Sequence, residues 1–271
     1  DKHYGHWMEV WAELTEPNDA GSMGLTKLAE GKGTRFQNMA LAGGVVQKTH
    51  ADDNSQDVTA TCRVPLQFWF NRNPGLALPL IALQYHEVKV MVTFASSITG
   101  LSGIGQTQLW ADYIYLDTDE RRRFAQVSHE YLIEQLQYQS SSPASTHKLN
   151  FNHPVKELIW CGQRSGTGGV HGGSATPVRI SLHSASGTKL RETDDTVTLK
   201  LNGHDRFAAR HDTYFTRTQP WQHHSNPGGG SASDAISVYS FALKPEEHQP
   251  SGTCNFSRID NAQLVFSSKV C

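Results

Sequence analysis

Histidine is the residue with the most evident chemical potential in this sequence, because fourteen of the 271 residues are histidines. Imidazole nitrogens bind zinc, copper and iron, and a site usually takes two or more of them at a fixed spacing. Close pairs occur at His3 and His6 and at His223 and His224, but no HxH, HExxH or facial-triad spacing is present. His129 opens the segment HEYLIE, which lacks the second histidine of a zinc-hydrolase helix. We therefore interpret the histidines as surface or turn residues and expect no metal and no cofactor.

Two acidic residues, Glu246 and Glu247, lie in the proline-bounded segment Pro245–Pro250. Catalysis by either carboxylate would need a partner acid or base held close to it, and the sequence identifies none. We interpret this segment as a rigid polar turn. The sequence predicts no catalytic residues and a protein that is not an enzyme.

The segment from Asp117 to Arg123 carries a dense cluster of charge. Its charged residues are Asp117, Asp119, Glu120, Arg121, Arg122 and Arg123. The arginines could bind a phosphate, but the acidic residues beside them nearly cancel the local charge. One interpretation is a solvated segment, whose exposed ion pairs contribute about 0–1 kcal/mol each. The other is a buried network between two domains, where removal of one partner leaves a charge unpaired. We place a domain boundary here, between residues 1–118 and residues 119–271.

Net charge and cysteine spacing exclude several classes of protein. The formal net charge is −2, so the chain has no electrostatic reason to bind nucleic acid. Cys62, Cys161, Cys254 and Cys271 form no CxxC pair, which argues against a zinc ribbon and suits buried, reduced thiols in a cytosolic setting. No apolar run is long enough to span a bilayer, and no signal peptide opens the sequence.

The elements that position these residues follow from hydrophobic periodicity. One apolar stripe, Trp7, Val10, Trp11 and Leu14, predicts a helix over His6–Glu16. The segment Asp19–Thr61 is expected to be a long loop with at most one short strand. Alternation or compact apolar runs predict strands at 64–70, 88–94, 109–116, 148–152, 178–183, 197–202 and 236–243. Short strands with long loops indicate sandwiches or jelly rolls, so the predicted fold class is all-β.

Large aromatic side chains, such as Trp160 and Trp221, are explained by core packing. The more specific alternative is that they form contacts between subunits. The polar run Thr216–Pro227 surrounds Trp221. We expect this run to be a loop at an interface or on the outer surface, and the sequence does not choose between the two.

Three long stretches carry a resemblance to a known family. They are Cys62–Glu87 (CRVPLQFWFNRNPGLALPLIALQYHE), Leu109–Gln137 (LWADYIYLDTDERRRFAQVSHEYLIEQLQ) and Val238–Asp260 (VYSFALKPEEHQPSGTCNFSRID). In this order they resemble the major capsid proteins of nucleocytoplasmic large DNA viruses, and those of algal viruses most of all.

The resemblance implies two consecutive jelly-roll domains, with this chain lacking the N-terminal strands of the first and the C-terminal strands of the second. In the family, the stretch that matches Asp117–Arg123 joins the two jelly rolls, which favours the buried interdomain network. The implied function is structural: a late viral protein that trimerises into pseudo-hexagonal capsomers of an icosahedral virion, assembled in the host cytoplasm.

The resemblance also implies partners. They are two further copies in a homotrimer, neighbouring capsomers, minor capsid proteins and the penton protein, with no direct contact to nucleic acid and no membrane insertion. Asn255 fits the N-glycosylation pattern, which is short and common by chance, and cytosolic assembly would leave it unmodified. Whether other sites on the outer loops carry sugars is left open by the sequence.

Two other functions compete with this one. A carbohydrate-binding or enzymatic jelly roll would line a concave sheet with Trp, His and Asp, and the sequence shows no cluster that demands it. A minor capsid or fibre-like protein of the same lineage is the other alternative. The match to stretches typical of the major protein argues against that alternative.

Overall fold

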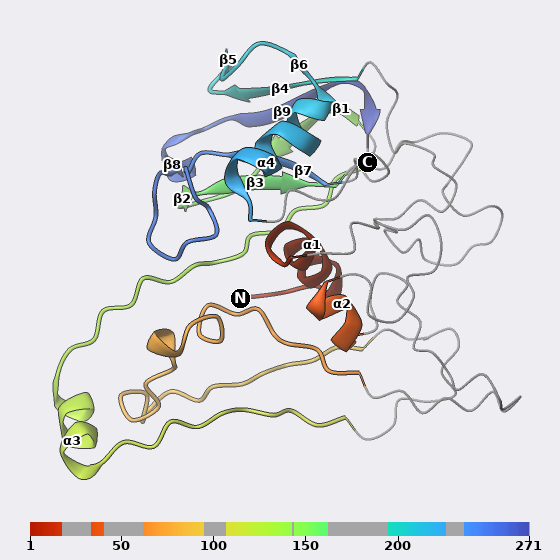
Figure 1. Cartoon of the computed structure of the whole chain (residues 1–271). Helices are drawn as coiled ribbons and strands as arrows, with labels where there is room; N and C mark the ends of the chain where they lie inside the picture. Colours follow the sequence, from red (N-terminus) through yellow and green to blue (C-terminus); the bar gives the residue numbers. More distant parts are fainter. Residues whose placement is uncertain are drawn as a thin grey trace, which may run out of the picture. The chain divides into compact units, whose positions relative to one another are not determined.

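The computed structural model describes residues 1–17, 34–40, 62–94, 107–142, 144–161, 195–225 and 236–270 (Figure 1). The chain forms two compact units. The first combines Asp1–Phe68 with Glu134–Cys271, and the second is Trp69–Ile133. All strands of the described residues lie in the first unit.

The largest sheet is antiparallel and has five strands: β1 (Ala144–Leu149), β9 (Ala262–Val270), β4 (Thr196–Leu201), β5 (His204–Asp205) and β6 (Arg210–His211). β9 lies between β1 and β4, and both β5 and β6 pair with β4 (Figure 1). Leu199 of β4 faces Leu264 of β9 in the ladder and is fully buried. Asn202 and Gly203, both at positive φ, make the two-residue turn of the β4–β5 hairpin. The strand predicted at 197–202 is therefore confirmed.

Two smaller antiparallel pairs accompany this sheet. β2 (Pro154–Val155) pairs with β8 (Cys254–Asn255), and β3 (Glu157–Trp160) pairs with β7 (Ser237–Ser240). The strand predicted at 236–243 is confirmed only as far as Ser240, because the next two amides, Phe241 and Ala242, both donate to the carbonyl of Lys156. The strand predicted at 148–152 is misplaced: β1 covers the six residues before Asn150.

Two glutamine side chains from the extended segment before β1 bond to the backbone at the end of this strand and just after it. The carboxamide of Gln137 donates to the carbonyl of Asn152 (3.0 Å) and accepts from the Asn152 amide (2.9 Å). The carboxamide of Gln139 donates to the carbonyl of Lys148 (2.6 Å) and accepts from the amide of Asn150 (2.9 Å). Each carboxamide thus replaces the backbone partner that an edge strand lacks.

A single apolar cluster fills the space beside the large sheet. Its buried members are Leu158, Val197, Leu199, Phe215, Phe256, Ala262, Leu264 and Phe266. They come from β3, β4, β9, the helical segment that follows β6, and η3 (Phe256–Arg258). Burial of these side chains is the main force that holds the strands together.

The helix predicted over His6–Glu16 is confirmed as α1 (Gly5–Thr15). Val10 and Leu14 of α1 pack with Ile236 and Val238, so the stripe is buried against the start of β7. The expectation of a loop over Asp19–Thr61 is wrong where it can be judged, because α2 (Arg35–Ala40) lies in it. Carboxylates of α1 hold α2 in place.

The segment expected as a polar loop around Trp221 is helical instead. It consists of the π-helical turn η2 (Tyr214–Thr218) and α4 (Gln219–His223). Pro220 stands in the first turn of α4, where its missing amide hydrogen costs nothing. Phe215 and Pro220 are buried while Trp221 is 72% exposed, so this segment packs onto the core by one face.

The second unit contains η1 (Pro74–Leu76) and α3 (Thr118–Gln126). The runs predicted as strands at 88–94 and 109–116 pair with no strand among the described residues, and neither does the run at 64–70. Most large apolar side chains of the runs 88–94 and 109–116 are exposed, as is Val64 of the run 64–70: Val64, Val88, Val90, Met91, Val92, Phe94, Leu109, Trp110, Tyr113, Ile114 and Tyr115. The strand predictions are wrong here because alternation makes a strand only where a partner supplies the ladder. The run at 178–183 lies outside the described residues. Where the structure describes the chain, no helix is both long and apolar enough to cross a membrane.

Candidate functional site

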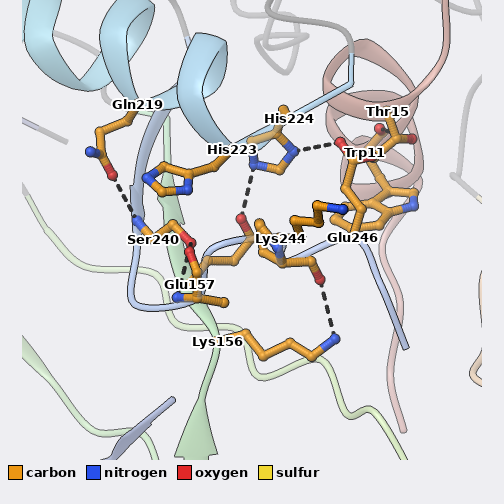
Figure 2. A network of polar contacts seen from close by, with 12 residues as sticks. Trp11, Thr15, Lys156, Glu157, Gln219, His223, His224, Ser240, Lys244 and Glu246 are labelled. Carbon is orange, nitrogen blue, oxygen red and sulfur yellow. Dashed lines mark hydrogen bonds and ion pairs between the residues drawn. The ribbon is translucent and has the colours of Figure 1, made fainter. Parts of the chain in front are cut away.

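A connected polar site of the first unit is centred on His224, the C-cap residue of α4 (Figure 2). The imidazole side chain is fully buried. Its Nε2 lies 2.9 Å from a carboxylate oxygen of Glu157 on β3. Its Nδ1 lies 2.9 Å from a carboxylate oxygen of Glu246, in the turn that follows β7. The ring therefore joins three segments that are distant in sequence.

The two carboxylates keep this buried ring charged. Burial lowers the pKa of His224, but the hydrogen bonds and charges of Glu157 and Glu246 outweigh it and raise the pKa to about 9. Burial raises the pKa of Glu246, while hydrogen bonds from His224 and Ser225 lower it further than burial raises it, so the net change is downward. At neutral pH the ring is an imidazolium with both N–H groups donating to carboxylates.

Two neighbours complete the surroundings of the ring. Ser225 donates through its amide to Glu246 (2.8 Å) and through its hydroxyl to the other oxygen of the same carboxylate. Trp11 of α1 faces the imidazole edge-on, with 6.4 Å between the ring centroids. Helix α1 thus helps to shield the site from water.

A second cation, Lys156, holds the same turn from another side. Its Nζ forms an ion pair with Glu134 and donates to the carbonyls of Pro245 (3.1 Å) and Glu247 (2.6 Å). Lys156 immediately precedes Glu157, so two adjacent residues hold the turn. Lys156 bonds to the backbone carbonyls of the turn. Glu157 bonds to His224, which in turn bonds to Glu246 of the turn. The predicted rigid turn is confirmed by these contacts.

This arrangement is suited to holding structure and not to catalysis. Both nitrogens of His224 are engaged by carboxylates, and the buried ring has no access to a substrate, so it cannot act as a general base. In the part of the chain that the structure describes, no three His, Cys, Asp or Glu side chains are placed to hold a metal ion. Removing one partner of such a buried ion pair typically costs about 3–5 kcal/mol.

The predicted charge cluster lies elsewhere, at the start of α3. Asp117 is the N-cap of this helix and accepts from the Glu120 amide (2.9 Å). Arg122 lies 3.9 Å from Asp119, and both side chains are mostly exposed. All the charged residues of the cluster, Asp117, Asp119, Glu120, Arg121, Arg122 and Arg123, are exposed in their own unit. Within their own unit these residues lie at the N-cap and in the first two turns of a short helix.

The other sequence candidates have local structural roles. Asn255 is exposed, and its side chain accepts from the Ser257 amide at the start of η3 (Phe256–Arg258). His129 hydrogen bonds to the carbonyl of Phe124 (2.8 Å) and stacks on its ring, at the end of α3. The expectation of buried thiols is wrong for Cys62, which is exposed. Cys254 is half-buried, and burial raises the pKa of its thiol.

Sequence reasoning missed the pairing of His224 with Glu246. It identified Glu246 as a residue without a partner and His224 as a surface residue. The two lie 22 positions apart, on a helix and a turn, so no fixed spacing reveals them. The available signal was that a histidine pair and an acidic turn flank the buried strand β7.

Two family descriptions match the chain and together cover nearly all of it. Residues 1–117 match the N-terminus of the major capsid protein, and residues 120–270 match the large eukaryotic DNA virus major capsid protein. A major capsid protein of Pyramimonas orientalis virus is 48% identical over 97% of this chain and 65% of the relative. That of Paramecium bursaria Chlorella virus 1 is 40% identical over 100% of this chain and 64% of the relative.

A solved structure agrees with these relatives. A quasi-atomic model of the PBCV-1 virus capsid is 36% identical, covers 99% of this chain and 67% of the capsid chain, and has a TM-score of 0.68. The relatives are named as capsid proteins and not as enzymes. The chain spans about two thirds of the length of these relatives, 65% and 64%. The chain belongs to the family of major capsid proteins of large eukaryotic DNA viruses.

Proposed function

We propose that this chain is part of the structural subunit of an icosahedral virus shell. The observation that carries the proposal is that both family matches are to major capsid proteins and together span residues 1–117 and 120–270. The polar site supports it, because its buried ion pairs fix backbone segments and leave no reactive group accessible. A shell subunit needs a rigid fold and contact surfaces, not chemistry.

The subunit contains two consecutive jelly rolls, divided near residues 118 and 119. Support for this division comes from the two family matches, which meet between residues 117 and 120. The antiparallel sheets of the first unit fit the second jelly roll. The exposed apolar runs at 88–94 and 109–116 lie within residues 1–117, which match the N-terminus of the major capsid protein. The helix that begins after Asp117 then connects the two.

Three such subunits form a closed trimer with a pseudo-hexagonal outline, because three chains of two similar domains present six similar faces. Capsomers contact one another, minor capsid proteins and a penton protein, and the shell is assembled in the host cytoplasm. Direct contact with the genome is not part of the proposal, since the net charge is −2. Outer loops are the place for surface glycans, whereas Asn255, which is exposed at the end of β8, stays unmodified when the shell is assembled in the cytoplasm.

Electron microscopy of the protein expressed from its complete reading frame tests this proposal. Negatively stained particles should have hexagonal outlines with three-fold symmetry. Single-domain-sized particles without symmetry would contradict the proposal. A glycan-binding screen on the same sample then tests the competing function, a carbohydrate-binding jelly roll, which predicts a specific sugar ligand.

A further inference from the structure

The buried cluster of His224, Glu157 and Glu246 has a property that the shell role does not require. One cation lies between two anions, and each anion belongs to a different segment. With its proton, the ring satisfies both carboxylates through its two N–H groups. Without its proton, the neutral ring has one N–H left, so one carboxylate loses its donor while the two negative charges remain buried together.

We propose that His224, Glu157 and Glu246 form a proton-dependent latch that fastens the end of α4 and the turn 244–250 to β3. The latch is closed while His224 carries its proton and opens when the proton is lost. Opening frees Ser225 as well, since its amide and hydroxyl are bonded to the same Glu246 carboxylate. The inference concerns this unit of the chain and holds whether or not the shell proposal is correct.

The remaining charged groups of the turn are engaged with other partners. Lys244 pairs with Glu247 at 3.1 Å, at an exposed position. Lys156 is bonded to Glu134 and to two turn carbonyls, and His248 lies 3.9 Å from Glu134. These contacts hold the turn from the side opposite to His224. They explain why opening of the latch loosens the turn without unfolding the unit.

The other two elements around the ring place no charge against it. On α4, His223 hydrogen bonds through Nδ1 to the carbonyl of Leu243 (3.0 Å). On α1, the uncharged Trp11 ring faces the imidazole. The acidic side chains Glu13 and Glu16 of α1 bond instead to residues of α2. Among the residues that the structure describes, Glu157 and Glu246 are therefore the charges that act on the ring.

The direction of the pH dependence follows from linkage. The ordinary pKa of histidine is 6.5, and the pKa of His224 is raised to about 9. Below pH 6.5 the closed and open forms both hold the proton, so the full stabilisation is present. Between pH 6.5 and 9 only the closed form holds it, so the opening constant rises by about tenfold per pH unit, on the order of 100-fold in all. Glu246, whose pKa is lowered, gives the acid limit: the latch is lost as the pH falls through the lowered value.

Hydrogen exchange of the complete capsid protein, followed by mass spectrometry from pH 6.5 to 9.5, tests the latch. After correction for the intrinsic exchange rate, the exchange of peptides covering 219–225 and 241–252 should give an opening constant that rises steeply with pH. Peptides from β4 and β9 should show no such rise. Protection that does not depend on pH in the first two peptides would overturn the proposal.

Three variants sharpen the test. In His224→Gln the two peptides should be loosened at every pH, with the steep dependence gone. In Glu246→Gln the dependence should move to lower pH, because one of the two charges that raise the histidine pKa is removed. His223→Gln is the matched control and should keep the dependence of the parent protein. A His224→Gln protein that keeps the parental slope refutes the latch. If His224→Gln does not fold, the parent series and Glu246→Gln decide the matter.

Discussion

Phe215 is the largest fully buried side chain among the residues that the structure describes. It lies in η2 and is fully buried. Its ring contacts four other aromatic rings, with centroid distances of 5.3 Å to Trp160, 5.4 Å to Phe207, 5.1 Å to Tyr214 and 6.5 Å to Tyr239. Phe215→Ala removes all four contacts and leaves a cavity between the helical segment and the large sheet.

The expected loss of stability follows from this burial. Truncating a buried phenylalanine to alanine costs about 3–5 kcal/mol, and the loss of several aromatic pairs places this site at the upper end. For a unit of this size, 1 kcal/mol corresponds to about 2–4 °C in melting temperature. We therefore expect the unit to melt about 6–20 °C lower.

Calorimetry of the complete protein measures this shift. Trp221→Ala is the matched control, because it truncates a larger aromatic residue on the adjoining helix α4 that is 72% exposed. Exposed substitutions usually change stability by less than about 0.5 kcal/mol, so the control should melt within about 2 °C of the parent. A Phe215→Ala protein that melts with the parent, or a control that falls as far, would refute the assignment of the core.

Three further changes test other parts of the structure. Gly252→Ala should lower the free energy of unfolding by about 1–3 kcal/mol or more, because Gly252 has φ 154 and an added Cβ would lie 2.6 Å from a backbone oxygen. Gly203→Ala is the control and should cost less, because Gly203 also has a positive φ but open space around it. Equal melting temperatures of the two variants would contradict the close contact. The double change Gln137→Ala with Gln139→Ala should leave the backbone of residues 148–152, at and after the end of β1, without these partners and promote aggregation on warming, seen by light scattering. Unchanged scattering would show that this backbone is protected in another way. Lys156→Met should cost about 2–3 kcal/mol in a denaturant titration, since it leaves two turn carbonyls and a carboxylate without their donor; a loss below about 0.5 kcal/mol would contradict its role in holding the turn.

Sequence reasoning succeeded where the signal is local. The stripe of α1 and the alternation of β4 predict elements that the structure contains, because each buries one face against a partner within the first unit. The family resemblance stated from three stretches is confirmed by the matches over 1–117 and 120–270.

Sequence reasoning failed where contacts are distant in the chain. The polar composition around Trp221 indicated a loop, but burial of Phe215 and Pro220 makes the segment helical. The partner of Glu246 is 22 residues away, so a buried ion pair was read as a surface turn. In the second unit, alternation alone predicted strands at 88–94 and 109–116, although a strand also needs a neighbour to bond with.

The solution mass of the protein expressed from its complete reading frame, measured by light scattering on a sizing column, tests the shell proposal most directly. The proposal predicts a mass three times that of the complete polypeptide, unchanged on dilution, because we expect the trimer contacts to be large and apolar. A monomer that behaves well at every concentration would contradict the proposal.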